Sequence, residues 1–292
     1  QQGGFELAQS HQGGYWTGRY NPRWEPATTR QAYSQLSTPP ATCAVVGAGL
    51  AGASVAASLA RRGWEVVVLD TAMEAAQGAS GLPVGLMIPQ PSVDDSPRSR
   101  ISRNGLRMMH QEAARCLHAG TDWAPSGVMQ RRPGEPEVWH PSGAWIKPAP
   151  LVRAWLGLTG VRLIGGATVT SMTQRHGEWV LWDSTGQELA RAQHVVLAAA
   201  TGTQVLLDQL GRDQPALQEV LQRLPAMSAL AGQVSWGIQS GRIGDTLPPF
   251  PVNGSGSLIG DVPVEGGIGW FAGATYEPPL PETPAIWSAA HR

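Results

Sequence analysis

Charged residues are scarce in this chain: they make up 15% of its 292 residues, against about 25% in an average globular domain. The 21 basic and 22 acidic residues nearly cancel and leave a formal net charge of −1. A nearly neutral chain has no broad electrostatic surface for nucleic acid, so any contact with a polyanion must be local. Lysine is almost absent, since Lys147 is the single one, and arginine therefore carries nearly all of the positive charge.

Cysteine is also rare, with only Cys43 and Cys116 in the chain. They lie far apart and form no CxxC motif, which excludes a disulfide framework and a cysteine-based zinc site and favours a reducing, cytoplasmic location. The 7 histidines show neither HxxxH nor HExxH spacing, so we expect no metal site. An uncharged stretch spans residues 43–60, but it is rich in glycine and alanine and no basic segment directly precedes it. We therefore expect neither a membrane span nor a signal peptide.

Glycine is abundant instead, with 36 residues, and several of them belong to a nucleotide-binding pattern. A short apolar run at residues 42–46 predicts a buried strand, and the motif GAGLAG follows at residues 47–52. An alanine-rich helix is expected over residues 53–62, and a second strand over residues 64–69 ends on Asp70. The order of strand, GxGxxG, helix, strand and acid predicts a complete dinucleotide-binding unit.

Each glycine of the motif has a physical role in such a unit. Gly47 allows the tight turn, Gly49 lets a pyrophosphate approach the backbone, and Gly52 lets the helix pack close to the sheet. The phosphates then lie at the helix N-terminus, where free N–H groups and the helix dipole favour anions. Asp70 is placed to accept hydrogen bonds from an adenosine ribose, which favours FAD or NAD over the 2′-phosphate of NADP.

The alternation of strands and helices stops after this unit. A glycine-rich loop and a proline-rich stretch follow, and then a helix is expected at about residues 103–118. Further on, the pattern predicts strands at 161–164 and 167–170, a hairpin of 178–182 and 187–191, and an apolar strand at 194–200. The last strand suits a return to the nucleotide sheet. Such an interruption is typical of flavoproteins, in which substrate-domain segments are inserted into the nucleotide domain.

These motifs, in this order, resemble the FAD-dependent D-amino-acid-oxidase-like (DAO) superfamily. Residues 78–81 (GASG) and 85–89 (GLMIP) resemble that family's GASGN and GxLYP loop, although Leu82 replaces the Asn. Residues 139–148 (WHPSGAWIKP) are similar to its PxGGWxxP segment, with Ala144 in place of a glycine. AGQVS at 231–235 and GATY at 273–276 occur in the expected positions. Together they resemble the oxidoreductase half of the MnmC family, bifunctional proteins that modify the tRNA wobble uridine.

The resemblance implies a mixed α/β fold, with a Rossmann-like FAD-binding domain of the glycine-oxidase type and an interleaved antiparallel-sheet substrate domain. Residues 1–40 would be the tail of a preceding methyltransferase domain plus a linker, and residues 41–292 the oxidoreductase domain. Within it we expect FAD-binding segments at about 41–92 and 150–205, and substrate segments at about 93–149 and 206–292. The family's late glycine-rich segment, which closes the FAD site, is expected to lie beyond Arg292.

FAD is the cofactor that the resemblance implies, without a metal. The residues expected to bind it are Gly47, Ala48, Gly49, Leu50, Ala51, Gly52, Asp70, Gly78, Ala79, Ser80, Gly81, Val169, Ala199, Ala200 and Gly202. We name no catalytic acid or base, because amine oxidation by a flavin needs little beyond correct positioning. Lys147 is either close to the flavin or an ordinary surface lysine.

The implied reaction is oxidation of 5-carboxymethylaminomethyl-uridine in tRNA, which leaves the aminomethyl form, with help from a methyltransferase domain that this chain lacks. Two alternatives stay open: a small-molecule amine oxidase of the glycine-oxidase type, and a truncated, non-catalytic nucleotide-binding fragment. Six arginines have two interpretations as well, either contacts to a phosphate backbone or a solvated helix face. They are Arg98, Arg100, Arg103, Arg107, Arg131 and Arg132.

Overall fold

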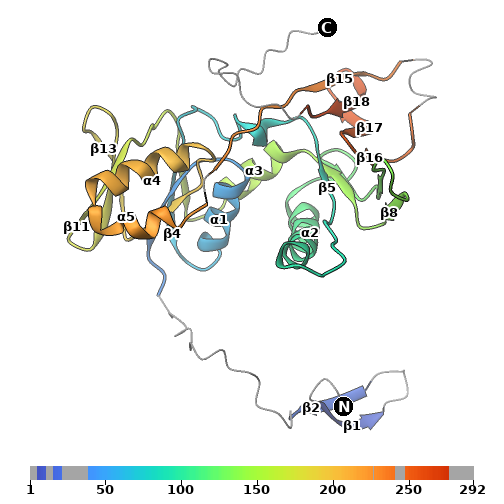
Figure 1. Cartoon of the computed structure of the whole chain (residues 1–292), viewed down its shortest axis with the longest axis horizontal. Helices are drawn as coiled ribbons and strands as arrows, with labels where there is room; N and C mark the ends of the chain where they lie inside the picture. The colour runs from blue at the N-terminus through green and yellow to red at the C-terminus, as the bar shows by residue number, and fades with distance from the viewer. Residues whose placement is uncertain (1–4, 11–15, 22–38, 226, 241–246, 276–292) are drawn as a thin grey trace. The chain divides into compact units, whose positions relative to one another are not determined.

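The computed structural model describes residues 5–10, 16–21, 39–225, 227–240 and 247–275 (Figure 1). The chain divides into two compact units, Gln1–Pro39 and Pro40–Arg292. In the first unit, β1 (Phe5–Ser10) and β2 (Trp16–Tyr20) form an antiparallel hairpin. The GATY motif at 273–276 ends one residue outside the described part of the second unit.

The second unit contains a parallel sheet of four strands. In spatial order they are β10 (Val161–Ile164), β4 (Glu65–Leu69), β3 (Thr42–Val46) and β14 (His194–Leu197). All three neighbouring pairs are parallel. The predicted return of the last strand to the nucleotide sheet is therefore confirmed, because β14 pairs with β3.

Helices and a small meander cover the two faces of this sheet. On β3, Cys43 and Val45 pack on one face in a cluster with α1 (Leu50–Ala60) and α3 (Pro148–Leu156). The residues between them point to the other face, as alternation along a strand requires. There they pack against the meander and α4 (Gly202–Asp213). The sheet is thus buried on both faces, as in doubly wound α/β proteins.

The meander corrects one expectation. Its strands are β11 (Ser171–Arg175), β12 (Glu178–Trp182) and β13 (Glu188–Ala192). The hairpin of β12 and β13 was predicted, but residues 167–170, predicted to be a strand, have no regular structure. The preceding turn explains this, since Gly166 N and Ala167 N donate to Ala72 O (3.0 Å) and Asp70 O (2.8 Å). These bonds hold the segment along the end of β4 instead of in the meander.

The remaining strands, which apart from residues 85–87 lie in the segments predicted to bind substrate, are at the end of the unit opposite the meander (Figure 1). A six-stranded sheet has the order β15 (Val234–Ile238), β18 (Gly267–Gly273), β17 (Ser257–Val264), β16 (Val252–Asn253), β7 (Val128–Gln130) and β8 (Val138–His140). A second sheet has the order β5 (Gly85–Met87), β9 (Ala144–Ile146) and β6 (Trp123–Ala124). Trp145 joins them by packing against Ile259 and Phe271.

Three helical segments complete the unit: η1 (Ala79–Gly81), α2 (Pro97–Cys116) and α5 (Pro215–Gln222). Helix α2 begins six residues before the expected position at 103. Ser96 caps it by accepting a hydrogen bond from Ser99 N, and Pro97 occupies the first helical position, two features typical of a helix start. Among the described residues, no helix is long and apolar enough to cross a membrane.

Candidate FAD-binding site

The turn after β3 requires glycine at its first position. Gly47 has a φ of +109°, a region that side-chain-bearing residues rarely adopt. Its N–H donates to Leu69 O at 2.7 Å, which ties the turn to the end of β4. A Cβ atom on Gly47 would also lie 2.4 Å from Ala198 O and 3.0 Å from the Cα of Ala199. The structure therefore brings the predicted residues Gly47 and Ala199 together at the ends of neighbouring strands.

The other two glycines of the motif are needed because of close approach. A Cβ on Gly52 would lie only 1.8 Å from Gly47 O and 3.2 Å from Cγ1 of Val45, so α1 packs directly on the turn. A Cβ on Gly49 would lie 3.0 Å from the hydroxyl oxygen of Ser80. The turn, the helix and the loop that contains Ser80 thus form one compact cradle.

The N-terminus of α1 is open to an anion. Its first turn contains no acidic residue, and the first N–H groups of a helix have no acceptor within the helix. Leu50 N donates to Ser80 Oγ at 2.9 Å, which places the 78–81 loop beside this end. The N–H groups of Ala51 and Gly52 stay available, and together with the helix dipole they suit a pyrophosphate. These features fit the phosphates of FAD.

Asp70 lies between the turn and the chain after β4. Its Oδ2 accepts from Ala48 N at 2.6 Å, and its Oδ1 accepts from Ala72 N at 2.8 Å. The carboxylate therefore fixes the turn as well as being a candidate for the ribose. Because an ionised carboxylate has about four lone-pair sites, two hydrogen bonds leave room for ribose hydroxyls.

The 78–81 loop has a second attachment to the cradle. Ala76 N donates to Ala48 O at 3.1 Å, and Gly81 N donates to Gly78 O at 2.8 Å. A Cβ on Gly81 would lie 2.3 Å from Ala76 O. The side chain of Ser80 links this loop to the helix start through the hydrogen bond from Leu50 N, a role that the motif alone does not reveal.

The remaining predicted residues occupy two places. Ala200, with a φ of +49°, lies between the end of β14 and Gly202, the first residue of α4. Ala199 N donates to the side chain of Thr203 at 3.1 Å. Val169 is 8% exposed and its side chain packs in the cluster under the sheet. A contact between Val169 and a cofactor would therefore use its backbone.

Lys147 is half-buried, and its ammonium donates to Pro263 O on β17 at 2.7 Å. This bond joins the residue before α3 to the large sheet. Lys147 therefore has a structural partner of its own.

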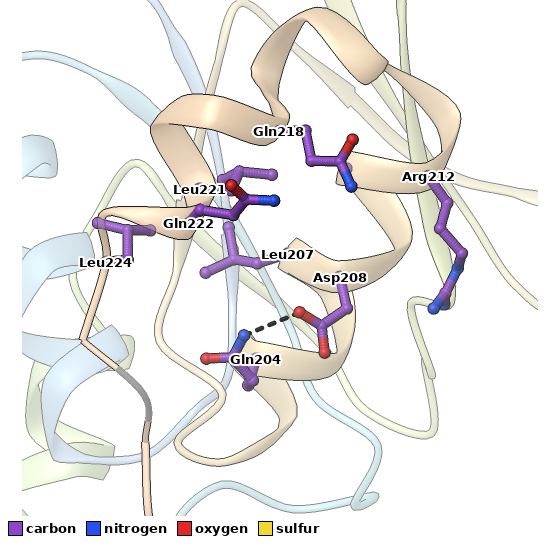
Figure 2. Close-up of a pocket in the computed structure, with 9 residues that line it drawn as sticks. Gln204, Leu207, Asp208, Arg212, Gln218, Leu221, Gln222 and Leu224 are labelled. Carbon is purple, nitrogen blue, oxygen red and sulfur yellow. Dashed lines mark hydrogen bonds between the residues drawn. The ribbon is translucent and has the colours of Figure 1, made fainter.

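A cavity of about 400 Å³ lies between α4 and α5 (Figure 2). Among its lining residues, Gln204 donates to Asp208 on the same helix at 2.8 Å, and Figure 2 marks this hydrogen bond with a dashed line. None of the residues predicted to bind FAD lines it. In the described part of the chain, no group of three or more His, Cys, Asp or Glu side chains is arranged to hold a metal ion.

The cradle indicates a protein that binds a dinucleotide such as FAD, and comparison with known proteins agrees with this class. The family model for FAD dependent oxidoreductases (DAO) matches residues 42–137, which include the glycine turn, Asp70 and the 78–81 loop. Solved structures with the same fold include glycine oxidase from Geobacillus kaustophilus, with a TM-score of 0.62 at 17% identity, covering 84% of this chain and 74% of that one. Amadoriase I from Aspergillus fumigatus has a TM-score of 0.56 at 18% identity, covering 85% and 66%. Over the matched residues 42–137 the chain is therefore a DAO-type FAD-dependent oxidoreductase, and its cofactor is FAD.

Its relatives in sequence are more specific. The tRNA 5-methylaminomethyl-2-thiouridine biosynthesis bifunctional protein MnmC of Albidiferax ferrireducens is 49% identical over 268 residues, which cover 89% of this chain and 44% of that protein. The protein of the same name from Polaromonas naphthalenivorans is 40% identical over 299 residues, which cover 89% and 46%. The chain thus spans less than half the length of these curated relatives. The predicted resemblance and fold class are confirmed.

Proposed function

We propose that this chain is the oxidoreductase part of a tRNA-modifying protein, and that it converts 5-carboxymethylaminomethyl-uridine at the wobble position into the aminomethyl form. The observation that carries the proposal is the 49% identity to an MnmC protein along 89% of the chain. The glycine oxidase and Amadoriase I structures are only 17% and 18% identical, so they support the fold and no particular substrate.

The cradle residues would hold the cofactor by its nucleotide end. The N–H groups of Ala51 and Gly52 would bind the pyrophosphate, and Asp70 would accept hydrogen bonds from the adenosine ribose. FAD, when bound, supplies the acceptor for a hydride. The methylene carbon of the carboxymethyl group would lose that hydride and the nitrogen a proton, so that a C=N bond forms between them. Water would then hydrolyse this imine, which leaves the aminomethyl group on the base and releases the carboxymethyl carbons as an aldehyde acid.

The same relatives suggest a partner domain for this chain. Their name describes a bifunctional protein, and a methyltransferase domain would supply the second activity. The reaction would take place in the cytoplasm, and the two free cysteines, one buried and one half-buried, agree with a reducing compartment.

Nucleoside analysis tests the proposal directly. Purified holoprotein is incubated with tRNA that carries the carboxymethylaminomethyl group, and the digested nucleosides are measured by mass spectrometry. We expect this nucleoside to decrease and the aminomethyl nucleoside to increase by the same amount. An unchanged pool would contradict the proposal.

Two further measurements identify the alternatives. Oxygen consumption with free glycine or sarcosine, together with an unchanged tRNA pool, would point to a small-molecule amine oxidase. A purified protein without visible flavin absorbance, even after FAD is added, would point to a non-catalytic fragment.

A further inference from the structure

A second cavity, of about 350 Å³, lies where residues 88–92, the end of a segment predicted to bind FAD, meet segments predicted to bind substrate. We call it the arginine pocket. It lies between the start of α2, the segment after β5 and the paired strands β7 and β16. Its lining residues are Ile88, Pro89, Gln90, Pro91, Ser92, Ser96, Arg98, Ser99, Gln130, Arg132 and Asn253. Two of these residues are cationic and none is acidic.

The structure separates the four arginines in the first half of α2 by their partners. Arg103 forms an ion pair with Asp95, and Arg100 approaches the same carboxylate at 4.0 Å. Arg107 donates to the side-chain oxygen of Asn104. For Arg98, no hydrogen bond or ion pair exists within the described residues. It is also the only arginine of α2 that lines the pocket.

Arg131 and Arg132 also differ in how closely each is paired with a carboxylate and in whether it lines the pocket. Arg131 forms an ion pair with Glu137 at 2.8 Å and does not line the pocket. Arg132 lines the pocket, and its contact with Glu135 is longer, at 3.6 Å between exposed side chains. An exposed ion pair of this kind contributes little energy, so Arg132 can accept another anion at low cost.

A buried network fixes the direction of Arg132. With the Gln130 amide oriented to satisfy both neighbours, its oxygen accepts from Nε and Nη2 of Arg132, each at 2.8 Å, and its nitrogen donates to His140 Nε2 at 2.8 Å. Gln130 and His140 are 8% and 6% exposed. Burial lowers the pKa of His140, and the positive charge of Arg132 lowers it further, so the imidazole is a neutral acceptor. The guanidinium is thus held in place by two hydrogen bonds to a neutral amide, beside its longer contact with Glu135.

The other walls suit part of a nucleotide. Ile88, Pro89 and Pro91 supply an apolar surface, and Asn253 supplies an amide. This wall also follows closely in sequence on the FAD cradle, because the chain runs from the 78–81 loop through β5 directly into residues 88–92. A cavity of 350 Å³ is larger than a single phosphate needs, so it has room for an attached ribose.

We propose that the arginine pocket binds a backbone phosphate of the tRNA substrate, with Arg98 and Arg132 as its two cationic contacts. The proposal rests on the proposed function. It explains how a chain with a net charge of −1 binds a polyanion, because the contact is local and uses arginine, which suits phosphate geometry. A carboxylate, such as that of the modified base, has similar chemistry, and the experiment below distinguishes the two sources.

The test compares two arginines of one helix. Arg98→Gln removes the pocket cation that has no partner, and Arg100→Gln removes the same charge two residues away, outside the pocket. The affinity of the holoprotein for an unmodified tRNA transcript is measured by fluorescence anisotropy at several salt concentrations. We expect Arg98→Gln to weaken binding roughly tenfold and to reduce the salt slope by about 1. Arg132→Gln should act similarly, and Arg100→Gln should stay within about twofold of the unchanged protein.

Each other outcome has a definite meaning. Equal affinities of the Arg98→Gln and Arg100→Gln proteins would overturn the pocket proposal, and tRNA turnover by the unchanged protein would still support the proposed function. Unchanged affinity for the unmodified transcript, with a raised KM for the carboxymethylaminomethyl substrate, would assign the pocket to the carboxylate and overturn the phosphate assignment. An unchanged protein that neither binds nor modifies tRNA would overturn both. Flavin absorbance and the melting temperature of each variant show that it is folded.

Discussion

Replacement of Gly52 by alanine tests whether the turn and α1 need their close contact. The added Cβ would lie 1.8 Å from Gly47 O, where real Cβ contacts essentially never fall under 3.0 Å, so helix and turn must separate by more than one ångström. Overpacking of this kind costs about 1–3 kcal/mol, and the higher helix propensity of alanine offsets up to about 1 kcal/mol. We expect a net loss of about 1–2 kcal/mol and a melting temperature lower by about 2–8 °C. Because the N–H groups proposed to bind phosphate also move, FAD affinity should fall at least about tenfold.

Gly105→Ala is the matched control, because Gly105 lies in the middle of α2 and a Cβ there would have no atom within 4 Å. The same chemical change should raise stability by about 0.5–1 kcal/mol and leave FAD binding unchanged. Thermal unfolding with and without FAD, and titration of flavin fluorescence, measure both effects. If Gly52→Ala melts as high as Gly105→Ala and binds FAD like the unchanged protein, the reasoning from close approach is refuted.

Three further predictions concern single side chains. Asp70→Ala removes a carboxylate that accepts from Ala48 N and Ala72 N. We expect FAD affinity, measured by fluorescence titration, to fall at least about tenfold. An unchanged Kd would contradict a ribose contact. Cys43 is 1% exposed, and burial raises the pKa of its thiol to about 11. It should therefore react with Ellman's reagent only after unfolding. In the Cys116→Ser protein, where Cys43 is the remaining thiol, fast reaction of the folded protein would contradict this. The lowered pKa of His140 means that the unfolded state binds more protons as pH falls below 6.5. Stability should therefore decrease from pH 7.5 to pH 5.5 more steeply than in His140→Gln, and equal slopes of melting temperature against pH would contradict this.

The nucleotide-binding unit was predictable because its signals are local. An apolar strand, three glycines at fixed spacing and an acid after the next strand each depend on residues that are close in sequence. The structure places Gly47, Gly52 and Asp70 in one cradle, and β3, α1 and β4 start and end within a few residues of their expected bounds. Only the positions of the helix ends were less certain, because propensity changes gradually there.

The contacts that complete the cradle depend on residues far apart in the chain. Ser80 accepts from Leu50 N thirty residues earlier, and Ala198 O, at the end of the neighbouring strand β14 but far along the chain, limits the space at Gly47. A pattern of residue types does not show which backbone atoms from distant parts of the chain come into contact. For the same reason, residues 167–170 looked like a strand, although Gly166 and Ala167 are bound to the chain after β4.

The arginines show most clearly what cannot be predicted from the sequence, namely which charged side chains pair with each other. Their pairing also changes how the net charge should be interpreted. In sequence, the six arginines at 98–107 and 131–132 are equivalent, and the total of −1 argues against a nucleic-acid partner. In the structure, Arg100 and Arg103 share Asp95, and Arg131 is paired with Glu137. At the arginine pocket, by contrast, Arg98 has no partner among the described residues, and Arg132 has only the longer contact with Glu135 at 3.6 Å. A net charge is a sum over the whole surface, whereas a phosphate responds to charges within about a Debye length of 8–10 Å. A near-neutral chain and an RNA substrate are compatible if the cations without strong partners are grouped in one place.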